Sequence, residues 1–291
     1  MNFLTAVQRA GKAAYFDPIR KIIVAATAEE AVRQEVMRRL VLEWNLSPSD
    51  LRVEEPMTRH QKGVRGRADV VVLLDAIPWI LFECKAPGVP VDDDALDQAL
   101  RYNDTLGSDY VCITNGDRSR WFLMDYNEAG TEYDPIEIEA PGHVNDLLEG
   151  TLQSLERQEF VRPTLAECHS TELAREYLEQ QDVIGCDTPS HLHPFIINLD
   201  GLLMQDTSLG AIGSHLEGMT VVEDGKRETK FGNAGGGSYD GTYRYFLLRD
   251  GSNEHTVVSL AFMATMKTEN DPWWGTLKGK TYLIVAIDDF E

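Results

Sequence analysis

The stretch "RADVVVLLDAIPWILFECKAPGVPV", residues 67–91, contains two strongly apolar runs, at 70–74 and at 79–82. Their length and composition predict two neighbouring buried strands. Asp69 stands directly before the first run, and the second run continues straight into Glu83-Cys84-Lys85. An ionised side chain on a central strand is costly unless it is paired or bound to a metal. The stretch therefore predicts a core that is built to carry these charges.

The bulk composition is that of a globular protein, with 43% hydrophobic and 26% charged residues in a chain of 291. No apolar run approaches the roughly 20 residues that span a bilayer, so no membrane partner is expected. The first residues lack the pattern of a signal peptide, and the four cysteines show no disulfide-framework spacing. These features predict a reduced, cytoplasmic protein. The strand-like end of the chain, "YLIVAIDDFE", suggests truncation at the C-terminus.

Helical periodicity predicts two helices around the apolar strands. The first covers residues 27–45, where Thr27 and Glu30 have capping-box spacing and an apolar stripe follows. The second covers residues 92–106 and begins at a run of three aspartates. Further strands are expected around 51–53 and in the segments "DYVCITNGD" and "RWFLMDYN", which read as a hairpin with an Asn-Gly turn.

This order of elements predicts an α/β layer with a mixed sheet flanked by helices. The expected domains are a first domain at 1–140, a helical connector at 141–185 and a smaller β-rich domain of unknown role at 186–291. Within the last domain, "GTYRYFLLRDGSNEHTVVSLAFMAT" is predicted as a hairpin with Asp250-Gly251 in its turn.

The charged residues of the opening stretch can form one site. Side chains alternate along a strand, so Glu83 and Lys85 share a face and Cys84 points away. If the two strands pair as a hairpin, Asp69 lies beside Glu83. Two carboxylates and the backbone carbonyl of Cys84 make an oxygen-rich site of the kind that Mg²⁺ prefers. Lys85 beside such an ion can orient or deprotonate a water aimed at phosphorus.

Four features together resemble a known family. They are "RAD" before the first strand, "ECKAP" after the second, the preceding helix "AEEAVRQEVMRRLV", and Gln98 with Tyr102 in "QALRY". The pattern is similar to the PD-(D/E)XK nuclease superfamily, in the form found at the N-terminus of type I restriction enzyme R (motor) subunits. It covers about residues 15–125, and Ala68 stands where that pattern has proline.

The resemblance implies a restriction-endonuclease-like core with particular roles for these residues. Asp69 and Glu83 would bind Mg²⁺, for which Mn²⁺ can substitute, and Lys85 would be the catalytic lysine. Gln98 and Tyr102 would support the active site or contact the DNA backbone. Glu35 on the leading helix is a candidate additional metal ligand, with a solvated helix-flank glutamate as the alternative.

The charge distribution bears on the substrate. The formal net charge of -21 opposes general nucleic-acid binding. A local basic segment precedes Asp69, and its members Arg59, Lys62, Arg65 and Arg67 are predicted to bind DNA phosphates. The alternative for this segment is a solvated loop.

The expected function is that of a metal-dependent endonuclease acting on DNA phosphodiester bonds in restriction, phage defence or DNA processing. RNA is the alternative polymer, and a second copy of the chain or restriction and defence subunits are the expected protein partners. The segment "LKGKT" lacks the first glycine of a phosphate-binding loop because Trp274 stands there, so no ATPase motor is expected. A non-cleaving module that binds nucleic acid or a partner remains the alternative function.

Overall fold

The structure is a computed structural model, and it describes residues 2–127, 132–147, 183–185, 187–211, 216–232, 238–264 and 279–288. The contacts divide the chain into two compact units. The first comprises residues 1–6, 13–19 and 24–155, and the second comprises residues 7–12, 20–23 and 156–291. Most of the connector expected at 141–185 lies outside the described residues, and the predicted domain boundaries stay a prediction.

A six-stranded mixed sheet forms the centre of the first unit. Its strands are adjacent in sequence order: β4 (Leu51–Pro56), β5 (Arg67–Leu74), β6 (Ile77–Cys84), β7 (Tyr110–Thr114), β8 (Ser119–Tyr126) and β9 (Tyr133–Ile138). All neighbouring strands are antiparallel except β6 and β7, which run parallel. A parallel pair needs a crossover connection, and helix α2 (Asp93–Leu106) supplies it.

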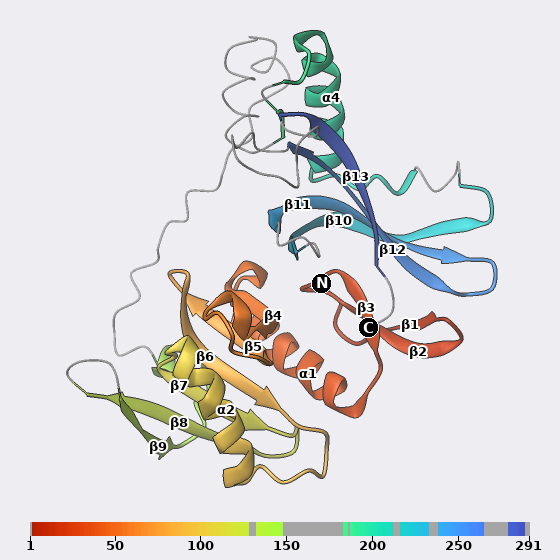
Figure 1. Cartoon of the computed structure of the whole chain (residues 1–291). Helices are drawn as coiled ribbons and strands as arrows, with labels where there is room; N and C mark the ends of the chain where they lie inside the picture. Colours follow the sequence, from red (N-terminus) through yellow and green to blue (C-terminus); the bar gives the residue numbers. More distant parts are fainter. Residues whose placement is uncertain are drawn as a thin grey trace. The chain divides into compact units, whose positions relative to one another are not determined.

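Helices cover both faces of this sheet, as the sequence predicts (Figure 1). Residues that alternate along β5 and β6 pack into two separate cores. Val70 and Val72 pack with the apolar stripe of α1 (Ala28–Leu42), whereas Val71 packs with Ala99 of α2. The strands therefore have two buried faces, which explains why their apolar residues run continuously instead of alternating with polar ones.

Both helices begin at the predicted capping residues, whereas α1 ends at Leu42, before the predicted end at residue 45. The Thr27 side chain accepts a hydrogen bond from the backbone N of Glu30 at 3.0 Å, and Asp92 caps α2 in the same way through Ala95. The Glu30 carboxylate accepts from Arg33 and Gln34, and the backbone N of Thr27 donates to the carbonyl of Ala25 at 2.8 Å. Glu30, in the first turn of α1, thus makes side-chain contacts in addition to its backbone bond with Thr27.

The Asn-Gly hairpin is confirmed between β7 and β8. Asn115 Oδ1 accepts from the backbone N of Asp117 and of Arg118, and Gly116 adopts a φ of 88° that favours glycine. Short 3-10 turns complete this unit at Pro48–Asp50, Met57–Arg59 and Val144–Leu147. The first residues of the chain form a three-stranded sheet in the order β1 (Thr5–Arg9), β2 (Lys12–Asp17) and β3 (Ile22–Ala25).

The second unit contains a four-stranded antiparallel sheet and a helix. The strands are β10 (Met219–Gly232), β11 (Ser238–Asp250), β12 (His255–Ala264) and β13 (Thr281–Asp288), in that order. The predicted hairpin is confirmed as β11 and β12. A 3-10 turn at Ser190–Leu192 leads into α4 (His193–Met204), a helix that no periodicity in its sequence predicts. The buried Arg244 donates to the carbonyls of Gln205 and Thr207 just beyond the end of α4, at 2.8 and 3.1 Å.

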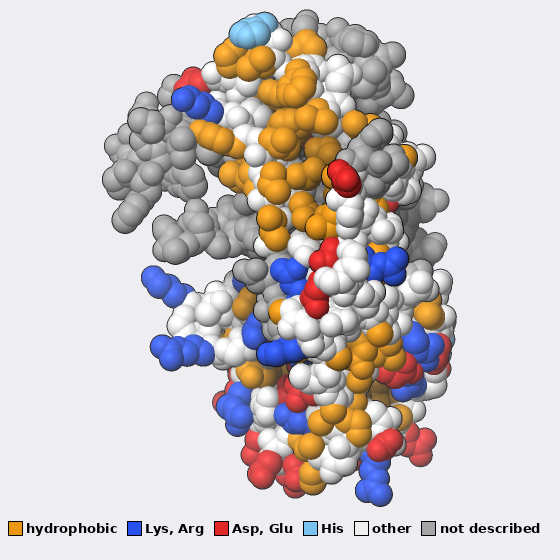
Figure 2. Space-filling view, turned by 90° about the vertical axis from the view of Figure 1, so that its right-hand side faces the viewer, with side chains coloured by type: hydrophobic (Ala, Val, Ile, Leu, Met, Phe, Trp, Pro, Cys, Tyr) orange, Lys and Arg blue, Asp and Glu red, His pale blue; other side chains and the backbone are white. Residues whose placement is uncertain are grey.

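Apolar side chains gather in the upper part of Figure 2, the part in which Figure 1 labels α4 and β13. Among the most exposed large apolar residues are Phe195 of α4 and, on alternating positions of β13, Leu283, Val285 and Ile287. No helix within the described ranges is both long and apolar enough to cross a membrane.

Candidate active site

The hairpin of β5 and β6 places Asp69 and Glu83 at the same level of the sheet. Val70 pairs with Phe82 and Val71 with Leu81, so the same register continued by one residue sets Asp69 opposite Glu83. The regular pairing ends at this point. Asp69 Oδ2 instead accepts from the backbone N of Cys84 at 2.6 Å, directly after Glu83 in the chain. The hairpin therefore brings the two predicted carboxylates together.

Of the two carboxylates, Glu83 is more deeply buried, with 2% of the residue exposed against 7% for Asp69. Its Oε1 accepts from Lys85 Nζ at 2.7 Å and from Gln98 Nε2 at 2.6 Å. Its Oε2 is also buried, and it has no hydrogen-bond partner among the described residues. A buried carboxylate oxygen without a donor is costly, so this atom marks a place where a ligand or ion would be stabilising.

Lys85 and Gln98 complete a closed triangle with Glu83. Lys85 Nζ donates to Gln98 Oε1 at 2.8 Å in addition to its bond with Glu83. Gln98 comes from α2, the crossover helix between β6 and β7, so the fold itself determines its position over the end of β6. The three side chains hold one another in a single arrangement, and the Lys85 ammonium is fixed beside the Glu83 carboxylate.

Tyr102, one turn after Gln98, lies against the loop that precedes β5. A Cβ atom on Gly66 would come within 2.7 Å of Tyr102 Cε1 and 2.9 Å of its hydroxyl oxygen. The loop is closed by the backbone N of Met57, which donates to the carbonyl of Gly66 at 3.0 Å. Tyr102 therefore supports the loop between β4 and β5, which we call the basic loop because it carries Arg59, Lys62 and Arg65. The face of α2 that carries Gln98 and Tyr102 thus contacts both this loop and the Glu83 carboxylate.

Burial and mutual repulsion disfavour the ionised state of these carboxylates. Burial, and then the nearby Asp69 charge, raise the pKa of Glu83 to about 7, against the opposing effect of Lys85. Burial also raises the pKa of Asp69, although Arg33 and the Cys84 amide lower it in part. The pKa of the Cys84 thiol is raised by its full burial on the α1 side of the sheet, where it lies in the apolar core. Cys84 thus points away from the site, as the alternation predicts.

The structure brings two acidic residues of α1 to this site and leaves Glu35 outside it. Arg33 donates to Asp69 Oδ1 at 2.7 Å and also contacts Glu29 and Glu30. Glu35 bonds to Arg38 on another side of the helix. Glu35 follows Glu30 by five positions, which corresponds to about 140° of rotation beyond one full turn at 3.6 residues per turn. The acidic residues of the leading helix that approach the site are therefore Glu29 and Glu30.

The four predicted DNA-binding residues divide into two groups. Arg59 is bonded to Glu55 at 3.0 Å and Arg67 to Glu54 at 2.9 Å. Lys62 and Arg65 are exposed and form no ion pair within the described part of the chain. Internal carboxylates thus already occupy half of the basic segment, a feature that the one-dimensional charge pattern does not reveal.

The donor set fits a hard divalent cation in charge and chemistry. Among the described residues, the ion pairs around the site join five carboxylates, of Glu29, Glu30, Glu54, Asp69 and Glu83, to the cationic groups of Arg33, Arg67 and Lys85, and the Cys84 amide connects Asp69 to the Glu83 end. Within the described ranges, no three His, Cys, Asp or Glu side chains are arranged to surround a metal. Mg²⁺ commonly takes one or two protein carboxylates and completes its shell with water and phosphate oxygens.

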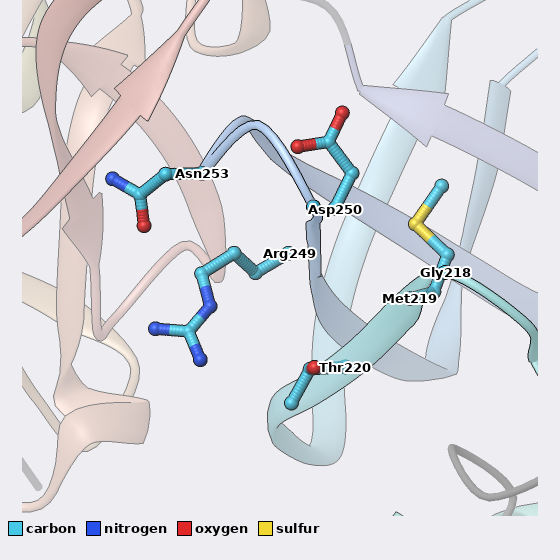
Figure 3. Close-up of a pocket in the computed structure, with 7 residues that line it drawn as sticks. Gly218, Met219, Thr220, Arg249, Asp250 and Asn253 are labelled. Atoms are coloured by element: carbon cyan, nitrogen blue, oxygen red, sulfur yellow. The ribbon is translucent and has the colours of Figure 1, made fainter.

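A separate hollow lies in the second unit, next to the β11–β12 turn (Figure 3). Its lining includes Thr220, Arg249, Asp250 and Asn253. Asp250 Oδ1 accepts from the backbone N of Ser252 and of Glu254, so its carboxylate is used to hold the turn. This hollow shows no cluster of groups comparable to the one around Glu83.

Comparison with protein families finds one match, to the type I restriction enzyme R protein N terminus, over residues 28–137. The matched segment runs from the start of α1 to the end of the six-stranded sheet and includes every predicted site residue. Neither the curated proteins nor the solved structures give a match. This segment of the chain is thus similar to a restriction-enzyme domain.

The pKa of Glu83 generates a test of the geometry in the absence of metal. Glu83 has a folded-state pKa of about 7 against an ordinary value of 4.5, so the folded protein holds this proton longer than the unfolded chain. The stabilising contribution is complete below pH 4.5 and is lost as the pH rises through 7. With a chelator present, wild type should lose up to about 1.4 kcal/mol per pH unit in this interval relative to Glu83→Gln. Urea denaturation from pH 5 to 7.5 measures the difference, and parallel stability curves would contradict the assigned burial.

Proposed function

We propose that the first unit is a divalent-metal-dependent nuclease of the PD-(D/E)XK type that hydrolyses DNA phosphodiester bonds. The observation that carries the proposal is the meeting of Asp69, Glu83, Lys85 and Gln98 at the end of the hairpin, with Glu83 Oε2 buried and unpartnered. The match of residues 28–137 to a restriction-enzyme domain supports the same chemistry. Mg²⁺ is the proposed ion, and Mn²⁺ is the proposed substitute.

Each side chain has a defined task in this proposal. Asp69 and Glu83, with the Cys84 carbonyl, would hold the ion, which supplies polarisation of the phosphate and activation of water when bound. Lys85 Nζ is held by Glu83 and Gln98 with one ammonium hydrogen left to donate. That hydrogen can orient the attacking water or stabilise charge on a non-bridging phosphate oxygen. Gln98 keeps the lysine in place because it forms hydrogen bonds both with Lys85 and with Glu83.

The approach of the substrate is assigned to the basic loop. Lys62 and Arg65 are exposed on the segment between β4 and β5, close in sequence to Asp69. The packing of Gly66 on Tyr102 connects this loop to the helix that carries Gln98. The chain has a net charge of -21, so the two exposed basic side chains Lys62 and Arg65 support only weak DNA binding that depends strongly on salt.

The restriction-enzyme similarity favours a role in restriction, phage defence or DNA processing, together with partner subunits of such a system or a second copy of the chain. One observation favours a second candidate function, a non-cleaving module that binds nucleic acid or a partner. Arg33 and the Cys84 amide already engage both oxygens of Asp69. A cleavage assay on DNA and RNA separates the two functions.

Replacement of Lys85 tests the catalytic assignment. Lys85→Ala should reduce Mg²⁺-dependent plasmid cleavage by at least about 100-fold, because the loss of one hydrogen-bond donor aimed at developing charge costs about 100- to 1000-fold. A chelator should abolish cleavage by the wild type. Lys12→Ala, a change of an exposed lysine in β2, is the matched control and should cleave like the wild type. Equal cleavage by Lys85→Ala would place the chemistry elsewhere.

The two groups of basic residues predict different salt dependences. Each lost phosphate contact lowers the slope of log affinity against log salt by about 0.9 for duplex DNA, or about 0.7 for single strands. The double variant Lys62→Ala, Arg65→Ala should therefore lose about 1 to 2 units of slope without metal present. Arg59→Ala should change the slope less, because Glu55 already holds that guanidinium. Fluorescence anisotropy over a salt series decides this. Identical slopes for the double variant and the wild type would remove the loop from the DNA path.

A further inference from the structure

One buried guanidinium joins carboxylates from three separate elements of the first unit. Arg33 of α1 donates to Asp69 Oδ1 of β5 at 2.7 Å and lies 2.8 Å from Glu54 Oε1 of β4. Within its own helix it also pairs with Glu29 and Glu30. The Arg33 side chain is only 7% exposed. Burial alone would lower its pKa, but Asp69, Glu30 and Glu54 outweigh burial, so Arg33 stays charged.

Glu54, which contacts this guanidinium, has an unusual backbone conformation. Val53 pairs with Val70 and Glu55 with Ala68, so Glu54 lies level with Asp69 on the neighbouring strand. Its φ of 52° is in the left-handed region, which a residue other than glycine adopts only at a cost. Two carboxylates on adjacent strands would repel one another. The position of Arg33 compensates for both unfavourable features.

A second arginine, Arg67, also pairs with the Glu54 carboxylate, on the solvent-exposed side. Arg67 Nε lies 2.9 Å from Glu54 Oε2, and its side chain is 58% exposed. Glu54 therefore bridges an exposed arginine of the basic segment and the buried Arg33. The result is a continuous chain of contacts from the surface to Asp69.

We propose that Arg33 is a positioning residue that acts as an internal counter-cation and competes with the divalent ion for Asp69. The inference rests on the proposed metal-dependent function. Arg33 supplies positive charge to the carboxylates of the network and occupies Asp69 Oδ1, so it keeps the acidic site folded without metal. For the same two reasons it weakens the affinity of the site for a divalent cation. Removal of Arg33 should therefore tighten metal binding while it destabilises the metal-free protein.

Direct Mn²⁺ binding tests this competition without any cleavage assay. Isothermal titration calorimetry of the full chain at pH 8 should give a Kd for Arg33→Gln at least tenfold lower than that of the wild type. Arg33→Lys keeps a cation but has a single donor group in place of the planar fork, so its Kd should fall between the two. This milder variant also serves if Arg33→Gln does not fold. Arg38→Gln is the matched control, because Arg38 is on the same helix and pairs with Glu35 and Glu43, away from Asp69.

The possible outcomes separate this inference from the function on which it rests. A lower Kd for both Arg33 variants, with Arg38→Gln unchanged, supports the competition. Mn²⁺ binding of equal strength by wild type and the Arg33 variants overturns the inference and leaves the nuclease proposal intact. Weaker binding by the Arg33 variants overturns it as well, since Arg33 would then support the metal. Binding of Mn²⁺ by none of these proteins overturns both the inference and the metal-dependent function.

Discussion

A buried carboxylate that is only half satisfied is the constraint on which this structure depends. Glu83 is 2% exposed, lies level with Asp69, and leaves Oε2 without a partner in the described part of the chain. Such a group is stable only if it is protonated, paired or bound to a cation. The structure uses the first two solutions, through the raised pKa of Glu83 and its bonds to Lys85 and Gln98. The third solution is the function that we propose.

The surrounding fold follows from the need to hold these charges in a dry core. Strands with two apolar faces supply enough burial to exclude water on both sides, and α1 and α2 cover those faces. The same helices deliver the polar partners from opposite sides: Arg33 reaches Asp69 from α1, and Gln98 reaches Glu83 from α2. The cores that stabilise the sheet and the contacts that position the carboxylates thus come from the same two helices.

The sequence predicted the parts of this site that depend on local periodicity. Alternation along β6 places Glu83 and Lys85 together, and Thr27 and Asp92 mark the N-termini of α1 and α2. The pairing of Arg33 with Asp69 and with Glu54 has no such signal in the sequence. The sequence pattern assigns Glu30 to the helix cap and leaves Glu35 as the acidic candidate, because only the rotation of α1 on the sheet decides which flank of the helix meets Asp69. The left-handed backbone of Glu54 gave no signal in the pattern of β4.

Elsewhere, two kinds of element were not predicted for physical reasons. Helix α4 is apolar around most of its surface and contains the β-branched pair Ile196 and Ile197, so its sequence shows no helical stripe and favours strand. The strands β1 to β3 are 4 to 6 residues long and polar in part, which is too short for a clear alternation. The charge pattern likewise could not show that Glu54 and Glu55 occupy Arg67 and Arg59.

The most direct test of the central claim is an anomalous difference map from crystals grown with Mn²⁺. The account predicts a peak within coordination distance of a Glu83 carboxylate oxygen and an Asp69 carboxylate oxygen, and no such peak in crystals of Glu83→Gln. A map with no density between these carboxylates at saturating Mn²⁺, or with the only peak elsewhere, would contradict the claim that this buried pair is a cation site.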